Sequence, residues 1–520
     1  MIHSSLLARP APASPTAKLV AAIAAIGLIG LPLFALARHH LASPNLWFDE
    51  AGQFWLARGL HHFSAPNSAA GGWDNFVDFG RVFNSDPGLF TLLLRGWMAV
   101  FGTTPLALRG LPFFLFLLTP GTIYWAARRI GAAPLLAVFA ASLPLGFPML
   151  LHYATEIRAY SMETSAVALL FFVPCWLQGE TRKWPVVLLG CVAALLVASR
   201  YSAFLFAAAA CLTALFPLRP FRPAFTRATL FAIPVILAVA IGYLLFARYQ
   251  AGGTHRAPAY TESYLLQGKD AATMLAQLRA NFFGREAWPI VIFLLFAPIF
   301  SWLGPKSLAA HRSLIARTAL FTALSVVFAL LGSYFGKLPW ALQTRWSIGY
   351  QALSVCCLAM TLLMIGIGLG RLNPLWLRRA LLSLLAIGGV GMWSTQLARA
   401  ASAERPYYET IASHLQALAR EPGAKDLRFY IQTGSAPAVR YLCEYGPLQG
   451  KFSYPERFHF ETGEELTAAA PISAKENDIV VLTHFSLLES HRKRVIDGTV
   501  EVHADPQPSC LLFLKPEVKP

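Results

Sequence analysis

The sequence predicts an all-α polytopic membrane protein with about eleven transmembrane helices and a small C-terminal α/β domain outside the membrane. Hydrophobic residues make up 56% of the 520 positions and charged residues only 13%. This composition excludes a water-soluble chain of ordinary type. Long apolar runs recur through residues 1–398, and residues 399–520 have the mixed composition of a soluble domain. We therefore predict a membrane domain followed by a soluble one.

The chain is strongly basic, with a formal net charge of +16. In a soluble protein this excess would suggest nucleic acid, but here the basic residues gather between apolar runs. Membrane topology and anionic lipid head groups explain that pattern, so no nucleic-acid partner is expected. Cys443 and Cys510 fall in the polar C-terminal region. A disulfide between them is left open, because it needs an oxidising compartment.

The apolar runs divide the membrane domain into spans. Residues 19–37 follow Lys18 and are predicted to be an uncleaved signal anchor that forms the first span. An exterior loop is expected over residues 38–104, and within it residues 88–101 are predicted to form a helix on the membrane surface, because this run is short and contains Arg95. The later spans are expected at residues 105–127, 132–152, 159–178, 184–198, 202–217, 228–247, 287–303, 316–335, 347–369 and 381–397.

The distribution of basic residues orients these spans. The connections assigned to the cytoplasm contain 13 Lys and Arg residues, and the short connections on the other side contain 4. The N-terminus is therefore expected in the cytoplasm, and the loop of residues 38–104, the loop of residues 250–286 and the C-terminal domain outside. The location predicted is the bacterial inner membrane, with the C-terminal domain in the periplasm or its equivalent.

The C-terminal region shows the periodicity of a small α/β domain. A helix is expected over residues 407–420, and strands over residues 427–432, 478–483 and 509–514. The chain has no Walker loop, zinc-finger spacing or internal repeat. An ATP-driven transporter is therefore disfavoured.

Two adjacent acids, Asp49 and Glu50, follow the first span directly. Carboxylates are costly in hydrocarbon, so such a pair either flanks the span in the head-group layer or performs a task there. Further ionisable residues are expected on the same face. Acids combined with cations are suited to bind a lipid phosphate while a carboxylate transfers a proton. The other candidates on this face are Glu156, Arg158, Arg200, Tyr201, Lys337 and Arg345.

Four segments recur in a characteristic order along the first part of the chain. They are Trp47-Phe48-Asp49-Glu50-Ala51, Asp86-Pro87-Gly88-Leu89-Phe90 with the residues up to Gly102, Ala107-Leu108-Arg109-Gly110-Leu111-Pro112 and Tyr153-Ala154-Thr155-Glu156-Ile157-Arg158-Ala159-Tyr160. Together they resemble the GT-C glycosyltransferases of the protein-mannosyltransferase and aminoarabinose-transferase type. The resemblance covers roughly residues 19–370. The chain departs from the pattern in having Ser85-Asp86-Pro87-Gly88 where His-Pro-Pro is common, and Arg200-Tyr201 where lysine-tyrosine is common.

The resemblance implies a GT-C fold, a polyprenyl-phosphate-linked sugar as the donor, and Asp49 as the essential acid/base residue. The residue types suit that chemistry: Asp49 would accept the proton of an acceptor hydroxyl that attacks the anomeric carbon, with inversion. Glu156 would orient Arg158 or contact the acceptor, and Glu50 is the less defined partner because helical neighbours point in different directions. The residues expected to bind the donor phosphate are Arg158, Arg200, Tyr201, Lys337 and Arg345.

Other classes remain open at this stage. A flippase or transporter for a lipid-linked glycan would use the same cations to line a passage, and a polysaccharide polymerase or ligase would share the lipid-linked donor. The acceptor is expected to be a glycolipid, a polysaccharide or a protein. The exterior acids and histidines show no tight ligand spacing, so no metal ligands are predicted. A divalent cation that bridges carboxylates and phosphate is left open.

Overall fold

The structure of the chain is a computed structural model in which two compact units can be distinguished. Unit 1 comprises Met1–Arg38, Ser85–Phe90 and Pro112–Ser402, and unit 2 comprises His39–Asn84, Thr91–Leu111 and Ala403–Pro520. The structure describes residues 14–41, 43, 46–60, 68–83, 86–177, 183–215, 225–249, 266, 268–282, 287–302, 311–336, 347–369, 391, 394, 398, 412, 415–431, 435–460, 478–482, 500–504 and 510–514.

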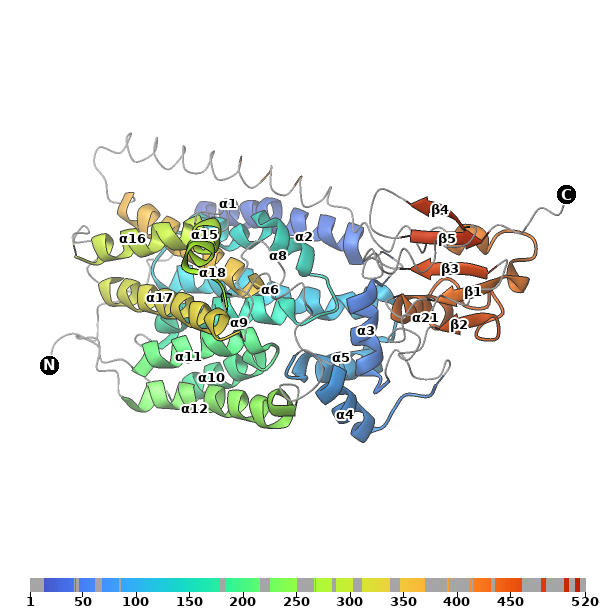
Figure 1. Cartoon of the computed structure of the whole chain (residues 1–520). Helices are drawn as coiled ribbons and strands as arrows, with labels where there is room; N and C mark the ends of the chain where they lie inside the picture. The colour runs from blue at the N-terminus through green and yellow to red at the C-terminus, as the bar shows by residue number, and fades with distance from the viewer. Residues whose placement is uncertain are drawn as a thin grey trace. The chain divides into compact units, whose positions relative to one another are not determined.

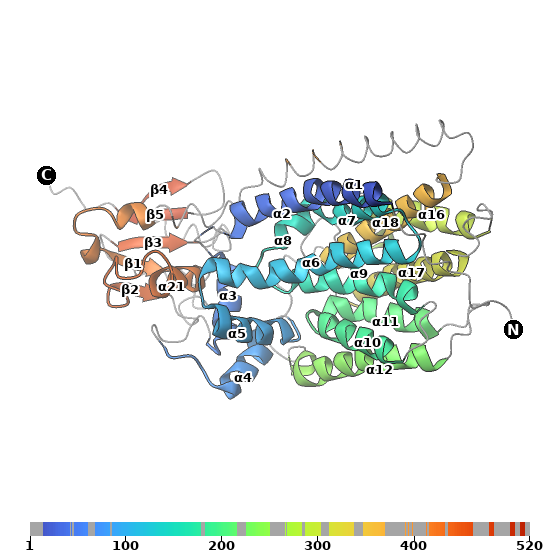
Figure 2. The same cartoon turned by 180° about the vertical axis from the view of Figure 1, so that it is seen from behind.

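Unit 1 is a bundle of helices, seen from two sides in Figures 1 and 2. Most of its elements follow the apolar runs of the sequence, because a helix satisfies the backbone polar groups of an apolar run internally. The helix Ala271–Phe282 lies in the loop expected over residues 250–286 and was not predicted. The helices are α1 (Pro15–Ala25), α2 (Leu31–Leu36), the later part of α6 (Pro105–Arg129), α7 (Pro134–Ser142), α8 (Pro148–Tyr153), α9 (Tyr160–Leu177), α10 (Trp184–Val197), α11 (Tyr201–Leu215), α12 (Phe225–Gly242), α15 (Ala271–Phe282), α16 (Trp288–Trp302), α17 (Arg312–Tyr334) and α18 (Ile348–Leu369).

Several of these helices are long and apolar enough to cross a membrane. In the described part of the chain, six such segments occur: Pro15–Leu36, Pro105–Arg129, Tyr160–Leu177, Ala228–Ala247, Arg312–Tyr334 and Ile348–Gly368. Each coincides with an expected span. Four other expected spans coincide with the shorter apolar helices Pro134–Gly146, Trp184–Val197, Tyr201–Ala214 and Trp288–Phe300. The span expected at residues 381–397 lies outside the described residues.

The span expected at residues 132–152 is not one continuous helix. α7 ends at Ser142, a 3-10 turn follows over Leu143–Gly146, and α8 begins at Pro148. Phe147 between them is extended, with φ −103° and ψ 108°. Proline lacks an N–H and disfavours a helical conformation in the residue before it. Pro148 therefore explains the break, which the apolar run alone did not indicate.

Helix α9 lies at the centre of unit 1. In its most apolar window 83% of the residues are buried, compared with 17% for Pro15–Leu36. It contacts α10, α11, α17 and α18. Small residues permit such close packing in membrane proteins. At Gly190 of α10, an added Cβ would lie 2.7 Å from the backbone oxygen of Phe231 in α12, so these two helices approach each other at backbone distance.

Unit 2 contains the loop after the first span and the C-terminal region. The loop forms α3 (Phe48–Ala57) and α4 (Trp73–Phe83), and most of α5 (Leu89–Phe101) belongs to the same unit. A helix was expected over residues 88–101, and α5 confirms it. Its position on a membrane surface stays a prediction.

The C-terminal region forms a five-stranded mixed sheet with the order β2-β1-β3-β5-β4. β1 pairs in parallel with β2 and β3, and β5 pairs antiparallel with β3 and β4. The helix α21 (Ala436–Glu444) connects β1 to its parallel neighbour β2, as a parallel pair requires. The strands are β1 (Arg428–Ile431), β2 (Phe458–Phe460), β3 (Asp478–Leu482), β4 (Val500–Ala504) and β5 (Cys510–Leu514). β1, β3 and β5 confirm the expected strands, whereas β2, β4 and α21 were not predicted.

Helix α21 packs against α3 within unit 2. The indole Nε1 of Trp55 donates a hydrogen bond to the Pro437 carbonyl at 3.0 Å. The Arg440 guanidinium lies over the Trp55 ring, 4.3 Å from its centroid. The Tyr441 hydroxyl donates to the Thr103 carbonyl at 2.9 Å, and burial raises the pKa of Tyr441, so the donor proton stays in place. The C-terminal region therefore holds the helix that carries Asp49.

Candidate active site

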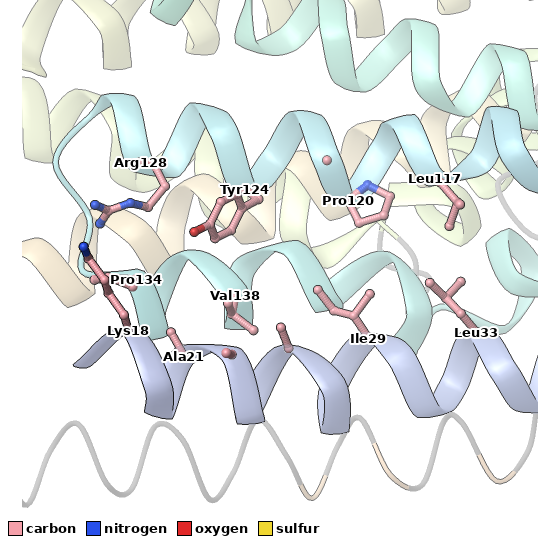
Figure 3. Close-up of a pocket in the computed structure, with 13 residues that line it drawn as sticks. Lys18, Ala21, Ile29, Leu33, Leu117, Pro120, Tyr124, Arg128, Pro134 and Val138 are labelled. Atoms are coloured by element: carbon pink, nitrogen blue, oxygen red, sulfur yellow. The ribbon is translucent and has the colours of Figure 1, made fainter. Parts of the chain in front are cut away.

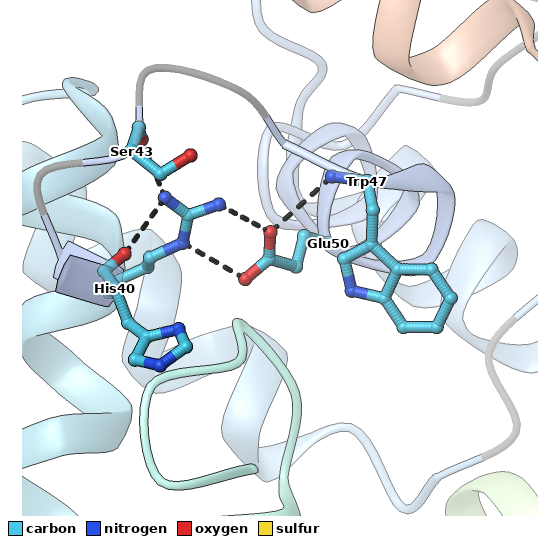
Figure 4. Close-up of polar contacts among 5 residues, drawn as sticks. His40, Ser43, Trp47 and Glu50 are labelled. Carbon is cyan, nitrogen blue, oxygen red and sulfur yellow. Dashed lines mark hydrogen bonds and ion pairs between the residues drawn. The ribbon is translucent and has the colours of Figure 1, made fainter. Parts of the chain in front are cut away.

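Glu50 forms a buried ion pair with Arg109 inside unit 2. The Arg109 Nε donates to Glu50 Oε1 at 3.1 Å, and Nη2 donates to Oε2 at 2.8 Å. The remaining nitrogen, Nη1, donates to the backbone oxygens of His40 at 3.2 Å and Ser43 at 2.6 Å (Figure 4). Both charged side chains are 1% exposed or less. The bidentate geometry satisfies the carboxylate and fixes its orientation.

This ion pair fixes the beginning of α3. Glu50 is the third residue of the helix, and its Oε2 also accepts the backbone N–H of the N-cap residue Trp47 at 3.4 Å. Arg109 thereby ties α3 to the backbone of His40 and Ser43. Breaking a buried pair by removing one partner costs about 3–5 kcal/mol. The carboxylate of Glu50 is engaged in holding the backbone, which favours a positioning role over the catalytic role expected from the sequence.

Asp49 is the neighbour of Glu50 in the first turn of α3 and is half-buried. Consecutive helical residues leave the axis about 100° apart, at 3.6 residues per turn. The two carboxylates therefore point in different directions. A helix N-terminus is a favourable place for a negative charge. Of the two adjacent acids, Glu50 supports the backbone at the start of α3, and Asp49 points in a different direction.

Unit 1 contains a second charged cluster, built from Asp86, Glu163 and Arg200. The Arg200 Nη1 lies 3.0 Å from Glu163 Oε2, and Nε lies 3.4 Å from Asp86 Oδ1. The Ser202 hydroxyl donates to Glu163 Oε1 at 2.6 Å, and the Arg200 guanidinium lies over the Tyr160 ring, 4.5 Å from the centroid. All three charged side chains are buried. Charged groups among transmembrane helices are costly and usually functional.

The beginnings of three helices meet at Glu163. Glu163 itself lies in the first turn of α9, and Ser202 lies at the start of α11. At the start of α18, a Cβ added to Gly349 would lie 2.6 Å from Glu163 Oε1. Helix N-termini carry partial positive charge. The three helix N-termini and Arg200 together favour a negative charge at this corner of unit 1, and the carboxylate of Glu163 supplies it.

The loop between α8 and α9 carries Glu156 and Arg158. Glu156 is buried and Arg158 is half-buried, and the Arg158 backbone N–H donates to the Glu156 carbonyl at 2.6 Å. The Ser161 hydroxyl anchors the loop by donating to backbone carbonyls on the α8 side. Arg158 acts electrostatically on Arg200. Two of the cations predicted to bind phosphate therefore lie in one neighbourhood.

The remaining predicted site residues are distributed as follows. Tyr201 is the first residue of α11 and is half-buried, with its ring edge-on to Phe204 at 5.6 Å. Lys337 and Arg345 lie outside the described residues. Asp49 and Glu50 belong to unit 2, and Glu156, Arg158, Arg200 and Tyr201 belong to unit 1.

Three charged residues of these clusters had no assigned role from the sequence. Glu163 carries a usable signal, because it is the one charged residue of the apolar α9, and an acid in such a helix is a candidate functional residue by default. Asp86 and Arg109 appear within recognisable segments, but their partners are distant in sequence. Arg109 pairs across 59 positions. No local pattern indicates such a pairing.

The described residues contain no group of three or more His, Cys, Asp and Glu side chains arranged to hold a metal ion. Cys443 has a free thiol that is buried. Burial raises the pKa of this thiol, as expected for a packing residue.

Comparisons with known proteins identify no family for the chain. No protein-family model matches it, and no curated protein matches it. Among solved structures, it is similar to the crystal structure of the Archaeoglobus fulgidus oligosaccharyltransferase in complex with zinc and sulfate, at 13% sequence identity and a TM-score of 0.43. The match covers 82% of this chain and 61% of that chain, so the chain spans about three fifths of that neighbour's length.

Proposed function

We propose that the chain is an integral-membrane glycosyltransferase of GT-C type, which moves a sugar from a polyprenyl-phosphate donor to an acceptor hydroxyl at the outer face of the membrane. The observation that carries the proposal is the first turn of α3. The buried Glu50–Arg109 pair fixes this turn, and α3 begins soon after the first apolar span. Asp49 is thus a rigidly mounted carboxylate in a membrane protein, as a general base requires.

The reaction needs one proton transfer and one displacement. Asp49 accepts the proton of the acceptor hydroxyl while the oxygen attacks the anomeric carbon. The bond between that carbon and the phosphate oxygen breaks, and polyprenyl phosphate leaves with the electron pair. The displacement is direct, so the configuration inverts. Since the donor already carries a good leaving group, one base and a few phosphate-binding cations account for catalysis.

The donor phosphate is assigned to the cations around the α8–α9 loop. Arg158 is the first of these, because its side chain is half-buried, whereas the side chain of Arg200 is buried. Arg200 and Tyr201 support the site from the start of α11. Lys337 and Arg345 complete the proposed group, and Glu156 orients Arg158 from the same loop. Glu50 positions Asp49 through the helix.

A lipid-glycan transporter is the main alternative, and the position of the charges disfavours it. Glu163 lies in the first turn of α9, Arg200 lies immediately before α11, and Asp86 precedes α5. A passage across the membrane would be expected to have polar groups along the middle of its helices. Charges gathered at helix ends fit a site at one membrane face.

The experiment that tests this function compares the glycans of a strain lacking the protein with those of its parent. Mass spectrometry of glycolipids and envelope polysaccharides is expected to show a missing sugar, which names the donor and acceptor together. Complementation with Asp49→Asn is expected to leave the sugar missing, because loss of a general base slows a reaction by roughly 10²–10⁴-fold. Asp74→Asn is the matched control, since Asp74 lies in the first turn of α4 in the same unit and is exposed.

Both variants must be inserted in the membrane at the wild-type level. Restoration by Asp74→Asn but not by Asp49→Asn supports the proposal. Full restoration of the sugar by Asp49→Asn refutes the assigned base, and identical glycans in the deletion strain and its parent refute the glycosyltransferase.

A further inference from the structure

Unit 1 contains an apolar groove that the proposed reaction does not use. The groove lies between the first helix segment, α1 and α2, and the helices α6 and α7 (Figure 3). Its volume is about 700 Å³, within the range of about 300–1,000 Å³ typical of ligand sites. Much of its wall is aliphatic, with Ile29, Leu33, Leu117 and Val138 among the lining residues. α6 and the first helix segment are both apolar enough to cross a membrane, so we expect the groove to face hydrocarbon.

Two cations lie at one end of this groove. Lys18 of α1 and Arg128 of the last turn of α6 extend toward the same end (Figure 3). The Arg128 Nη1 donates to the Ala132 carbonyl at 2.5 Å, which holds its guanidinium in place. Among the residues that the structure describes, neither cation forms an ion pair with a carboxylate. Two like charges beside an apolar channel favour an anion between them.

The dimensions of the groove match a membrane lipid. From Lys18 to Leu33 the helix advances roughly 22 Å at 1.5 Å per residue. One leaflet of the hydrocarbon core is roughly 15 Å deep, half of its full thickness. A lipid with its phosphate at the level of Lys18 therefore has room to extend one chain along the groove. The exposed Tyr124 and Gly121 line the same channel, which leaves it accessible from the side.

We propose that this groove binds one anionic glycerophospholipid, with the head-group phosphate between Lys18 and Arg128 and an acyl chain along α1, α2 and α6. Basic pockets between transmembrane helices on the cytoplasmic side bind such head groups. The positive-inside count assigns both cations to that side. The proposed sugar transfer takes place at the outer face, so the occupant is a structural phospholipid and not the polyprenyl-phosphate donor.

The test titrates the full-length protein in detergent with phosphatidylglycerol and follows the bound lipid by native mass spectrometry. The double variant Lys18→Gln/Arg128→Gln is expected to weaken phosphatidylglycerol binding roughly thirtyfold. This factor follows because each basic residue beside an anionic head group contributes about fivefold. Lys183→Gln/Arg312→Gln is the matched control, because both residues are exposed basic residues in connections predicted to be cytoplasmic. It is expected to bind like the wild type.

A second pair of variants tests the apolar part of the groove. An added Cβ at Gly121 meets nothing within 4 Å, and Gly121 lines the groove, so Gly121→Leu is expected to fill part of the groove and to reduce phosphatidylglycerol binding. Gly27→Leu is its control, since a Cβ there is equally unhindered and Gly27 does not line the groove.

Several results would overturn the proposal. The first is equal phosphatidylglycerol binding by the groove variants and their controls. The second is binding of phosphatidylcholine to the wild type as tightly as phosphatidylglycerol. The third is displacement of phosphatidylglycerol by equimolar polyprenyl phosphate. Loss of binding confined to the two groove variants, with a clear preference for the anionic phospholipid, supports it. Neither result depends on the glycan experiment, so each proposal can fail without the other.

Discussion

Arg109 pairs with Glu50, one of the two adjacent acids at the start of α3. Its guanidinium takes both oxygens of Glu50 and two backbone carbonyls, so all of these groups are satisfied in a buried setting. A buried charge that loses its partner keeps its desolvation cost without compensation. Glu50 and Arg109 are therefore expected to be far more sensitive to single substitutions than exposed ion pairs of the same unit.

Arg109→Gln is expected to destabilise the protein by about 3–5 kcal/mol, because it leaves the Glu50 carboxylate buried without its cation. Arg81→Gln is the matched control: Arg81 pairs with Asp78 on α4, but those side chains are 29% and 70% exposed, and such pairs contribute about 0–1 kcal/mol. The measurement is the thermal unfolding midpoint of the purified protein. Equal shifts for the two variants would contradict the structural role of Arg109.

At the scale of elements, Gly349 sets how closely α18 approaches α9. A Cβ at this position would lie 2.6 Å from Glu163 Oε1 and 2.7 Å from the Phe206 ring. Both neighbours are themselves held, Glu163 by Arg200 and Ser202 and Phe206 by burial. The contact therefore allows only glycine unless the helices separate.

Gly349→Ala is expected to destabilise the protein by about 1–3 kcal/mol, the usual cost of overpacking. Gly368→Ala is a control in the same helix, because an added Cβ there meets nothing within 4 Å. Alanine favours a helix over glycine by about 1 kcal/mol, so this second variant should be neutral or slightly stabilising. Thermal unfolding in detergent measures both. A Gly349→Ala variant as stable as Gly368→Ala would show that α9 and α18 do not pack as closely as the structure has them.

The packing of α3 against α21 explains why the C-terminal region groups with the early loop in unit 2. Trp55 and Pro437 are 382 positions apart, yet they share a buried hydrogen bond. The aromatic rings of Phe54, Tyr441 and Tyr445 add edge-to-face contacts. Helix α21 of the C-terminal region thereby supports α3. The separate C-terminal domain expected over residues 399–520 stays a prediction.

For the whole molecule, the prediction that matters most is topology. The distribution of basic residues predicts the Asp49 loop outside and the connection between α9 and α10 in the cytoplasm. In a chain whose native cysteines are changed to alanine, Asp74→Cys is expected to react with a membrane-impermeant thiol reagent in intact cells. Lys183→Cys should react only after permeabilisation. Both positions are exposed, so a difference in labelling reports on which side of the membrane each position lies. The reverse labelling pattern would show that the orientation is the opposite of the predicted one and that Asp49 is not at the outer face.

The sequence by itself determined the membrane class, most helix positions and three of the five strands, because the length of an apolar run, its period and its flanking charges are local properties. Local information failed where proline broke a continuous apolar run at Pro148. Local information did identify the two acids of the first turn of α3 as candidates, because ionisable residues are unusual beside an apolar span.

Only the tertiary structure decided which partners the charged residues Glu50 and Glu163 have. The partners of Glu50 and Glu163 lie 59 and 37 positions away, and the choice among several arginines depends on which helix ends come together. The groove between α1, α6 and α7 likewise exists only once these helices pack. A charge pattern shows that cations and acids are present, but burial and distance determine which pairs neutralise each other and which two cations, Lys18 and Arg128, share one end of an apolar groove.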